Sequence, residues 1–230
     1  MVEQLALVLV GGEKERLLQT RLPQAGWVEL RVDRFLSVFP REDLTGWVKQ
    51  VRRHFSGRLV ATVRWFKEQA APVNRLTESE REKFYRILLP EVDYLDVELR
   101  SCLARKMVGQ AHQQNRKVIL SSHYFMSCPG NSALRRLYRR FRLLNGDILK
   151  VAARVCSRED LLRLVAFTAN YSRKCPLVVI PMGTTLLERL IPLSFGSLFT
   201  YAALSSKTAP GQPGYREILQ LWRALSAGGF

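Results

Sequence analysis

Apolar runs six to eight residues long recur along the chain and are separated by longer, more polar segments. Eight such runs stand out, at residues 5–10, 27–33, 58–64, 93–99, 117–123, 147–153, 176–182 and 197–204. Their starts lie about 20 to 35 residues apart, the spacing of a strand followed by a helix and then the next strand. The pattern therefore predicts parallel β-strands joined by helices.

The segments between the runs carry signals typical of helices. Thr77 and Glu80 have the spacing of a capping box, and Ser157 with Asp160 repeats that pattern more weakly. Residues 135–142 alternate arginines with leucine and aromatic residues, which predicts an amphipathic helix with a charged outer face. Helices are expected over residues 11–22, 41–55, 77–89, 135–142, 157–172 and 214–227.

Strands that alternate with helices eight times within 230 residues predict an α/β protein with a (β/α)8 barrel. A doubly wound sheet is the alternative, but neither GxGxxG nor GxxxxGK[ST] occurs in the sequence. No Gly/Ser-rich linker or break in composition divides the chain, so residues 1–230 are expected to form one catalytic domain.

Composition narrows the functional classes. The four cysteines form no CxxC pair and only three histidines are present, so neither a disulfide framework nor a zinc site is expected. No apolar run approaches the ~20 residues of a membrane span, which predicts a cytoplasmic protein. The net charge of +16 fits either a polyanion-binding protein or an enzyme that attracts an anionic metabolite.

Polar side chains stand near the carboxyl ends of the predicted strands, where barrel enzymes hold their reactive groups. These polar residues are Glu29, Arg31, Arg64, Asp96, Glu98, His123 and Lys150. The apolar Met182 stands at the end of the seventh predicted strand. Lys150 lies in the apolar run GDILKVA and either extends its amine to water or acts as an amine nucleophile. With His123 moving protons, Glu98 or Asp96 orienting the imidazole, and arginines binding a carboxylate, these groups predict a metal-free lyase or aldolase that uses a lysine Schiff base.

Motifs carried by these residues resemble the type I 3-dehydroquinate dehydratase (3-dehydroquinase) family. They are ELRVD at 29–33, DYLDVEL at 93–99, SSHYF at 121–125, GDILKVA at 146–152, PMG at 181–183, FGS at 195–197 and TAPGQ at 208–212. The resemblance extends from around residue 5 to around residue 225. It implies a (β/α)8 hydro-lyase of the shikimate pathway that needs no cofactor, forms a homodimer and converts 3-dehydroquinate to 3-dehydroshikimate.

The resemblance also implies a role for each residue of the site. Lys150 would form the imine with the substrate ketone, His123 would transfer protons, and Glu98 would orient and tune His123. The implied substrate contacts are Glu29 and Arg31 for the ring hydroxyls, Arg64 as a further polar contact, Arg189 with Gln212 for the carboxylate, Thr208 of the TAPGQ loop, and Met182 and Phe195 as apolar contacts. Glu188, which precedes Arg189, departs from the serine usual in the family.

Two other functions remain open at this stage. Another lysine-imine barrel, such as a class I aldolase, would keep Lys150 but would not require Glu29, Arg31 and the TAPGQ loop together. A basic polyanion-binding barrel without catalysis would show salt-sensitive binding and would be indifferent to Lys150→Ala.

Overall fold

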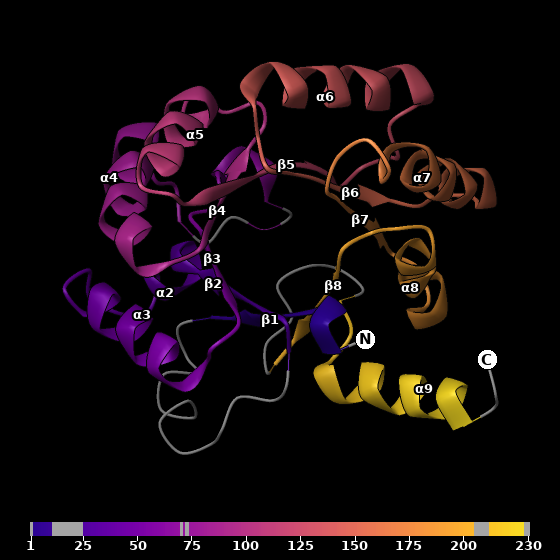
Figure 1. The fold of residues 1–230 in the computed structure, drawn as a ribbon, viewed down its shortest axis with the longest axis horizontal. Coiled ribbons are helices and arrows are strands. Elements are labelled where there is room, and N and C mark those ends of the chain that lie inside the picture. The colour runs from indigo at the N-terminus through magenta and orange to yellow at the C-terminus, as the bar shows by residue number, and fades with distance from the viewer. Residues whose placement is uncertain (1, 11–24, 70, 72–73, 205–211, 228–230) are drawn as a thin grey trace.

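The computed structural model describes residues 2–10, 25–69, 71, 74–204 and 212–227 and shows eight strands surrounded by helices (Figure 1). The strands are β1 (Leu5–Leu9), β2 (Trp27–Arg31), β3 (Arg58–Thr62), β4 (Tyr94–Glu98), β5 (Lys117–Tyr124), β6 (Ile148–Arg154), β7 (Leu177–Met182) and β8 (Thr200–Ala203). Their order in the sheet is β7-β6-β5-β4-β3-β2-β1-β8, and every neighbouring pair is parallel. Parallel neighbours of this kind need a long crossover connection between them, most often a helix.

The α-helices form the ring outside the strands in Figure 1. They are α2 (Val32–Phe35), α3 (Asp43–His54), α4 (Glu78–Leu88), α5 (Ala104–Gln113), α6 (Asn131–Leu144), α7 (Arg158–Tyr171), α8 (Leu186–Ser194) and α9 (Tyr215–Ala227). In the described part of the chain, three short 3₁₀ segments accompany them, η1 (Val2–Gln4), η3 (Phe66–Glu68) and η4 (Leu89–Glu91). Among these described helices, none is long and apolar enough to cross a membrane.

The sheet closes on itself where β8 meets β7. The amide of Leu198, just before β8, donates a hydrogen bond of 2.8 Å to the carbonyl of Leu177 at the start of β7. The amide of Val179 donates to Ser197 Oγ at 3.1 Å. Together with the β1–β8 ladder, these contacts complete the barrel fold that the sequence pattern predicts.

Apolar side chains separate into two groups on the two faces of the barrel wall. The larger group lies between strands and helices, and Leu30, Val97, Leu149 and Val179 are typical members. Residues at alternate positions of the same strands point into the barrel, as the period of a β-strand requires. The inner apolar group is the smaller one because much of the interior is occupied by charged side chains.

Most of the predicted elements are present, with small differences at their ends. All eight apolar runs contain a strand, and the predicted capping box of Thr77 and Glu80 begins α4. The run predicted over 27–33 ends earlier, because Val32 and Asp33 begin α2. The helix predicted over residues 11–22 lies outside the described residues.

Candidate active site

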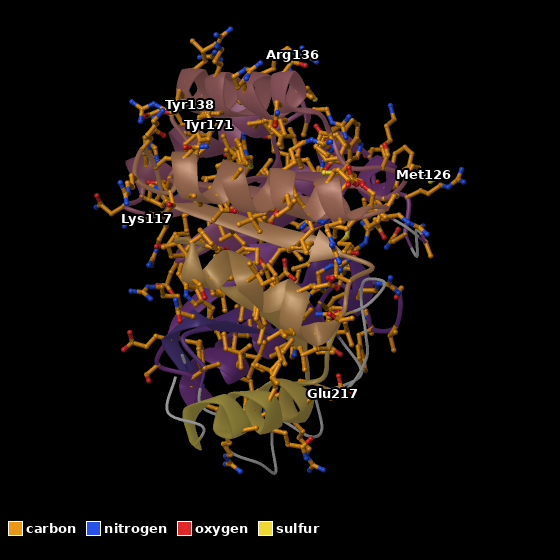
Figure 2. All side chains as sticks on the ribbon, turned by 90° about the vertical axis from the view of Figure 1, so that its right-hand side faces the viewer. Lys117, Met126, Arg136, Tyr138, Tyr171 and Glu217 are labelled. Carbon is orange, nitrogen blue, oxygen red and sulfur yellow. The ribbon has the colours of Figure 1, made fainter. Side chains whose placement is uncertain are left out.

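A pocket opens at the carboxyl ends of the strands, on the axis of the barrel. Figure 2 shows the barrel from the side, with Lys117 at the start of β5 and Met126 beyond its end on opposite sides of the molecule. The pocket lies toward the Met126 end. It is lined by Val8, Glu29, Arg31, Arg34, Arg64, Glu68, Gln69, His123, Phe125, Lys150, Ala152, Ile180, Met182, Arg189, Tyr201 and Gln212.

Lys150 projects from the middle of β6 into this pocket and is only 4% exposed. Its Nζ atom lies 2.7 Å from Asp96 Oδ2, 2.9 Å from the Tyr201 hydroxyl and 3.5 Å from Glu29 Oε1. A buried ammonium requires such partners, because an isolated charge is expensive to remove from water. The side chain is therefore held inside the barrel and does not extend to solvent.

His123 stands at the end of β5, and its partner is Glu68 of η3. Its Nδ1 atom lies 3.0 Å from Glu68 Oε2, and the same oxygen accepts the His123 backbone N–H at 2.9 Å. Arg100 Nε donates to the other oxygen of Glu68 at 3.0 Å. A carboxylate in this position fixes the proton on Nδ1 and leaves Nε2 as the basic atom.

The electrostatic surroundings keep His123 neutral and Glu68 ionised. Burial, together with the positive charge of Arg64, lowers the pKa of His123 to about 4. Burial alone would raise the pKa of Glu68, but the hydrogen bond with His123 and the charge of Arg100 lower it. An imidazole that is neutral at pH 7 can accept a proton, which is what a general base must do.

The structure corrects the role expected for Glu98. Its Oε1 atom accepts hydrogen bonds of 2.8 Å from Arg64 and from the backbone N–H of Trp65, and its Oε2 atom accepts from Arg81. In the ladder between β4 and β5, Glu98 pairs with Ser121, two residues before His123. Two residues along a strand are about 6.5 Å, so Glu98 lies one layer too deep to orient the imidazole.

Asp96, the other carboxylate considered for orienting His123, pairs with Lys150 instead. Besides Lys150, it contacts Arg64 at 3.1 Å and accepts a hydrogen bond of 2.6 Å from Ser121 Oγ. Burial favours its protonated form, but the charges of Arg64 and Lys150 hold the pKa of Asp96 far below its usual range. Asp96 is therefore an ionised partner of the lysine.

Charged groups for an anionic ligand line the rest of the pocket. Arg31 donates from Nε and Nη2 to the two oxygens of Asp33, at 2.9 and 2.7 Å, which fixes the plane of its guanidinium. Arg189 extends from α8, is 2% exposed and donates to the carbonyl of Pro181 at 3.4 Å. Burial lowers the pKa of Arg189 to about 10, so the side chain stays charged at neutral pH.

Glu188, the residue before Arg189, is absent from the pocket lining. Its carboxylate completes a capping box with Thr185 at the start of α8, accepting from the Thr185 backbone N–H at 2.9 Å. It therefore contributes to the helix that carries Arg189 and does not compete for its guanidinium.

Of the two residues expected as apolar contacts, Met182 lies in the pocket and Phe195 does not. Met182, at the end of β7, lines the pocket, and so does Gln212, the polar residue expected to assist Arg189. Phe195 does not: it caps the carboxyl end of α8, is 44% exposed and is absent from the pocket lining. Helices of a barrel return the chain to the amino ends of the strands, so a residue that ends α8 lies at the wrong end of the barrel. Phe125 is the phenylalanine of the pocket, and Thr208 lies outside the described residues.

Sequence reasoning missed Glu68 and Tyr201. Glu68 follows β3 by a few residues, and its position after a strand end was a usable signal. Nothing in the sequence indicates that η3 brings it across to a histidine on β5, two strands away in the sheet. Tyr201 reads as one more aromatic residue of β8, and only the structure shows its hydroxyl beside Lys150.

The fold and the site define the class of protein: a (β/α)8-barrel enzyme with a buried amine and a neutral imidazole in one arginine-lined pocket. Within the part of the chain that the structure describes, no three His, Cys, Asp or Glu side chains gather to hold a metal ion.

Comparison with known proteins gives the family. The family model for type I 3-dehydroquinase matches residues 8–228. A 3-dehydroquinate dehydratase from Hydrogenobaculum is 32% identical over 90% of this chain and 91% of its own. The crystal structure of the 3-dehydroquinate dehydratase from Aquifex aeolicus has a TM-score of 0.81 and 29% identity, covering 96% of this chain and 97% of its own. That from Geobacillus kaustophilus has a TM-score of 0.83 at 24% identity, with 98% and 92% covered, and supports the fold.

The chain belongs to the type I 3-dehydroquinase family, a family of hydro-lyases. The family, the barrel and the lyase class predicted from the sequence are confirmed.

Proposed function

We propose that this protein removes water from 3-dehydroquinate to give 3-dehydroshikimate, through an imine between Lys150 and the ring ketone. The observation that carries this assignment is the placement of the Lys150 amine, which is buried in the barrel yet faces one pocket with His123 and four arginines. A lysine that is buried and paired with carboxylates cannot contact a polyanion, which argues against a polyanion-binding barrel. The family to which the chain belongs performs this dehydration.

The chemistry uses Lys150 and His123 in sequence. The Lys150 ammonium first loses one proton to solvent, and the neutral amine then adds to the ketone. Protonation of the former ketone oxygen and its loss as water give a protonated imine that withdraws electrons from the neighbouring C–H bond. Nε2 of His123 takes that proton, and the same proton then leaves with the β-hydroxyl as water. Hydrolysis of the imine returns the amine and releases the product, with no net oxidation or reduction.

The remaining residues hold the substrate. Arg189 pairs with its carboxylate, assisted by Gln212, while Glu29 and Arg31 bind the ring hydroxyls. Arg64 supplies a further polar contact and Met182 an apolar one. Thr208 remains a substrate contact predicted from the sequence.

Three further properties belong to the same proposal. Residues 1–230 act as one catalytic domain, two copies associate as a homodimer, and the enzyme works in the cytoplasm without a metal or cofactor. Sedimentation velocity tests the dimer, and dialysis against a chelator tests the independence from metal: the expected result is one species of twice the chain mass with undiminished activity.

The function is tested by following formation of the conjugated enone product by its ultraviolet absorbance. Wild-type protein should turn over 3-dehydroquinate, and borohydride should inactivate it only when substrate is present, because only the imine is reduced. Turnover without substrate-dependent inactivation would contradict the imine. No turnover, together with borohydride inactivation in the presence of aldol substrates, would support a class I aldolase.

A further inference from the structure

Among the described residues, Tyr201 is the one uncharged hydrogen-bond partner of Lys150, and it has no part in the chemistry above. Its hydroxyl lies 2.9 Å from Lys150 Nζ, and both side chains line the pocket. The residue is 6% exposed, and its ring packs edge-on against Phe199 at 5.4 Å. The phenol is therefore held in place by packing and points at the atom that would attack the substrate.

The partners of Lys150 differ in what they can do for that attack. Asp96 and Glu29 are carboxylates, which stabilise the ammonium but carry no proton to give when ionised. Burial, with Glu29 and Asp96 nearby, raises the pKa of Tyr201 well above its ordinary value, so the phenol keeps its proton at neutral pH. Among the described side chains that contact the Lys150 amine, Tyr201 is the one whose hydroxyl accepts the hydrogen bond that Nζ donates and also has a proton of its own to give.

Imine formation needs such a donor. When an amine adds to a ketone, the C=O electron pair moves to oxygen, and that oxygen must be protonated before it can leave as water. The oxygen and the attacking nitrogen are bonded to the same carbon, so a group within hydrogen-bond reach of the nitrogen is also close to the oxygen.

We propose that Tyr201 is a catalytic residue that relays a proton between the nitrogen and the oxygen of the carbinolamine formed on Lys150. This inference rests on the function proposed above. The phenol protonates the alkoxide and regains a proton from the attached ammonium. It then protonates the hydroxyl, which leaves as water while the nitrogen lone pair forms the C=N bond.

The resulting phenolate faces the positively charged iminium. In the hydrolysis that ends the cycle, it takes a proton from the attacking water and so returns to the phenol. Each proton that Tyr201 gives is thus recovered within one turnover, and no other reactant is needed.

The test uses Tyr201→Phe, which keeps the ring and its packing on Phe199 and removes only the oxygen. Single-turnover mixing with 3-dehydroquinate, quenched by borohydride, measures the rate of imine formation. That rate should fall about 100-fold, the size of a general-acid contribution. Tyr94→Phe is the matched control, because Tyr94 is also a buried phenol of the barrel interior but faces Trp27 at the other end. It should leave the rate unchanged.

A second measurement distinguishes loss of proton donation by Tyr201 from a change in the reactivity of the Lys150 amine. Acrylonitrile alkylates a free amine without passing through a carbinolamine, and peptide mass spectrometry reports the modification of Lys150. In Tyr201→Phe the alkylation rate should stay within roughly twofold of wild type while imine formation is slow.

If both rates fall together, Tyr201 only positions Lys150, and the relay is wrong. If imine formation is unchanged, the hydroxyl has no role. If wild-type protein forms no trapped adduct while acrylonitrile still reacts, the proposed function itself fails, and the relay fails with it.

Discussion

The two ends of the barrel interior are built from the same strands but from different side chains. β2 begins with Trp27 and continues inward-facing with Glu29, and β4 begins with Tyr94 and continues with Asp96 and Glu98. The amino end is thus aromatic and the carboxyl end is charged. Every second residue of a strand points inward, so both sets lie inside the barrel. The two ends differ because the first inward position of these strands is aromatic and the later inward positions are charged.

The aromatic end is held by packing. Trp27 lies 4.5 Å from Phe199 and 4.9 Å from Tyr94 between ring centroids, and the Arg58 guanidinium sits 4.9 Å above the indole. The ring contacts depend on shape and area, and the Arg58 guanidinium is exposed, so any of these contacts can be lost without leaving a buried charge unpaired.

The charged end is held by pairing. Three buried acidic and three buried basic side chains form one connected network, made of Glu29, Asp96, Glu98, Arg64, Arg81 and Lys150, and Arg81 links it to the partly exposed Glu78. Because these charges balance, the surplus behind the net charge of +16 lies elsewhere, for example on the outer side of α6, where Figure 2 shows Arg136. Removing one member of the network leaves another buried and unpaired, so the two ends should respond differently to substitution.

The largest effect is expected at the amine itself. Lys150→Met keeps an unbranched side chain of similar length but cannot form an imine, so turnover should fall about 10⁴-fold or more. Measured kcat, with a circular dichroism spectrum to establish folding, checks this. Retention of a tenth of the wild-type rate in a folded variant would show that Lys150 is not the nucleophile.

Substitution of Glu68 should lower activity, whereas substitution of Glu98 should lower stability. Glu68→Gln weakens the hold on His123 Nδ1, and kcat should fall about 100-fold with little change in stability. Glu98→Gln removes the partner of Arg64 and Arg81, and the free energy of unfolding should fall by about 3–5 kcal/mol. Denaturant titration and steady-state rates on both variants test the pair, and the reverse pattern would restore Glu98 as the partner of the histidine.

A substitution at the aromatic end should lower stability and leave activity unchanged. Trp27→Ala should lower the free energy of unfolding by about 3–5 kcal/mol, because it opens a cavity beside Tyr94 and Phe199. At temperatures where the variant remains folded, kcat should match wild type. A loss of kcat comparable to that of Glu68→Gln would mean that the two ends are not independent.

The smallest effect concerns pH. His123 must be neutral to accept a proton, and its pKa is lowered to about 4. Activity should therefore persist on acidification past the ordinary histidine range and be lost only as the pH approaches 4. A profile of kcat/KM against pH measures this, and an acid limb near about 6.5, the pKa of an unperturbed histidine, would contradict the burial of His123.

Strand positions were predictable because the sequence repeats one local pattern eight times, and Lys150 and His123 were predictable because each lies in a strand. Glu68 was not, since η3 must cross from β3 to the side of β5 to bring it to His123. Phe195 failed for a related reason: its place depends on where α8 ends, which sequence periodicity does not give. The Tyr201 contact depends on the width of the barrel, a property of all the strands together.

The most direct test of the central role of Lys150 is to map the site of imine formation. The protein is mixed with 3-dehydroquinate, reduced with borohydride, digested and analysed by peptide mass spectrometry, with Lys150→Met in parallel. We expect one adduct, on the peptide that contains Lys150, and none in the variant. An adduct on another lysine, or product formed by wild-type protein with no adduct at all, would contradict the assignment of Lys150 as the nucleophile.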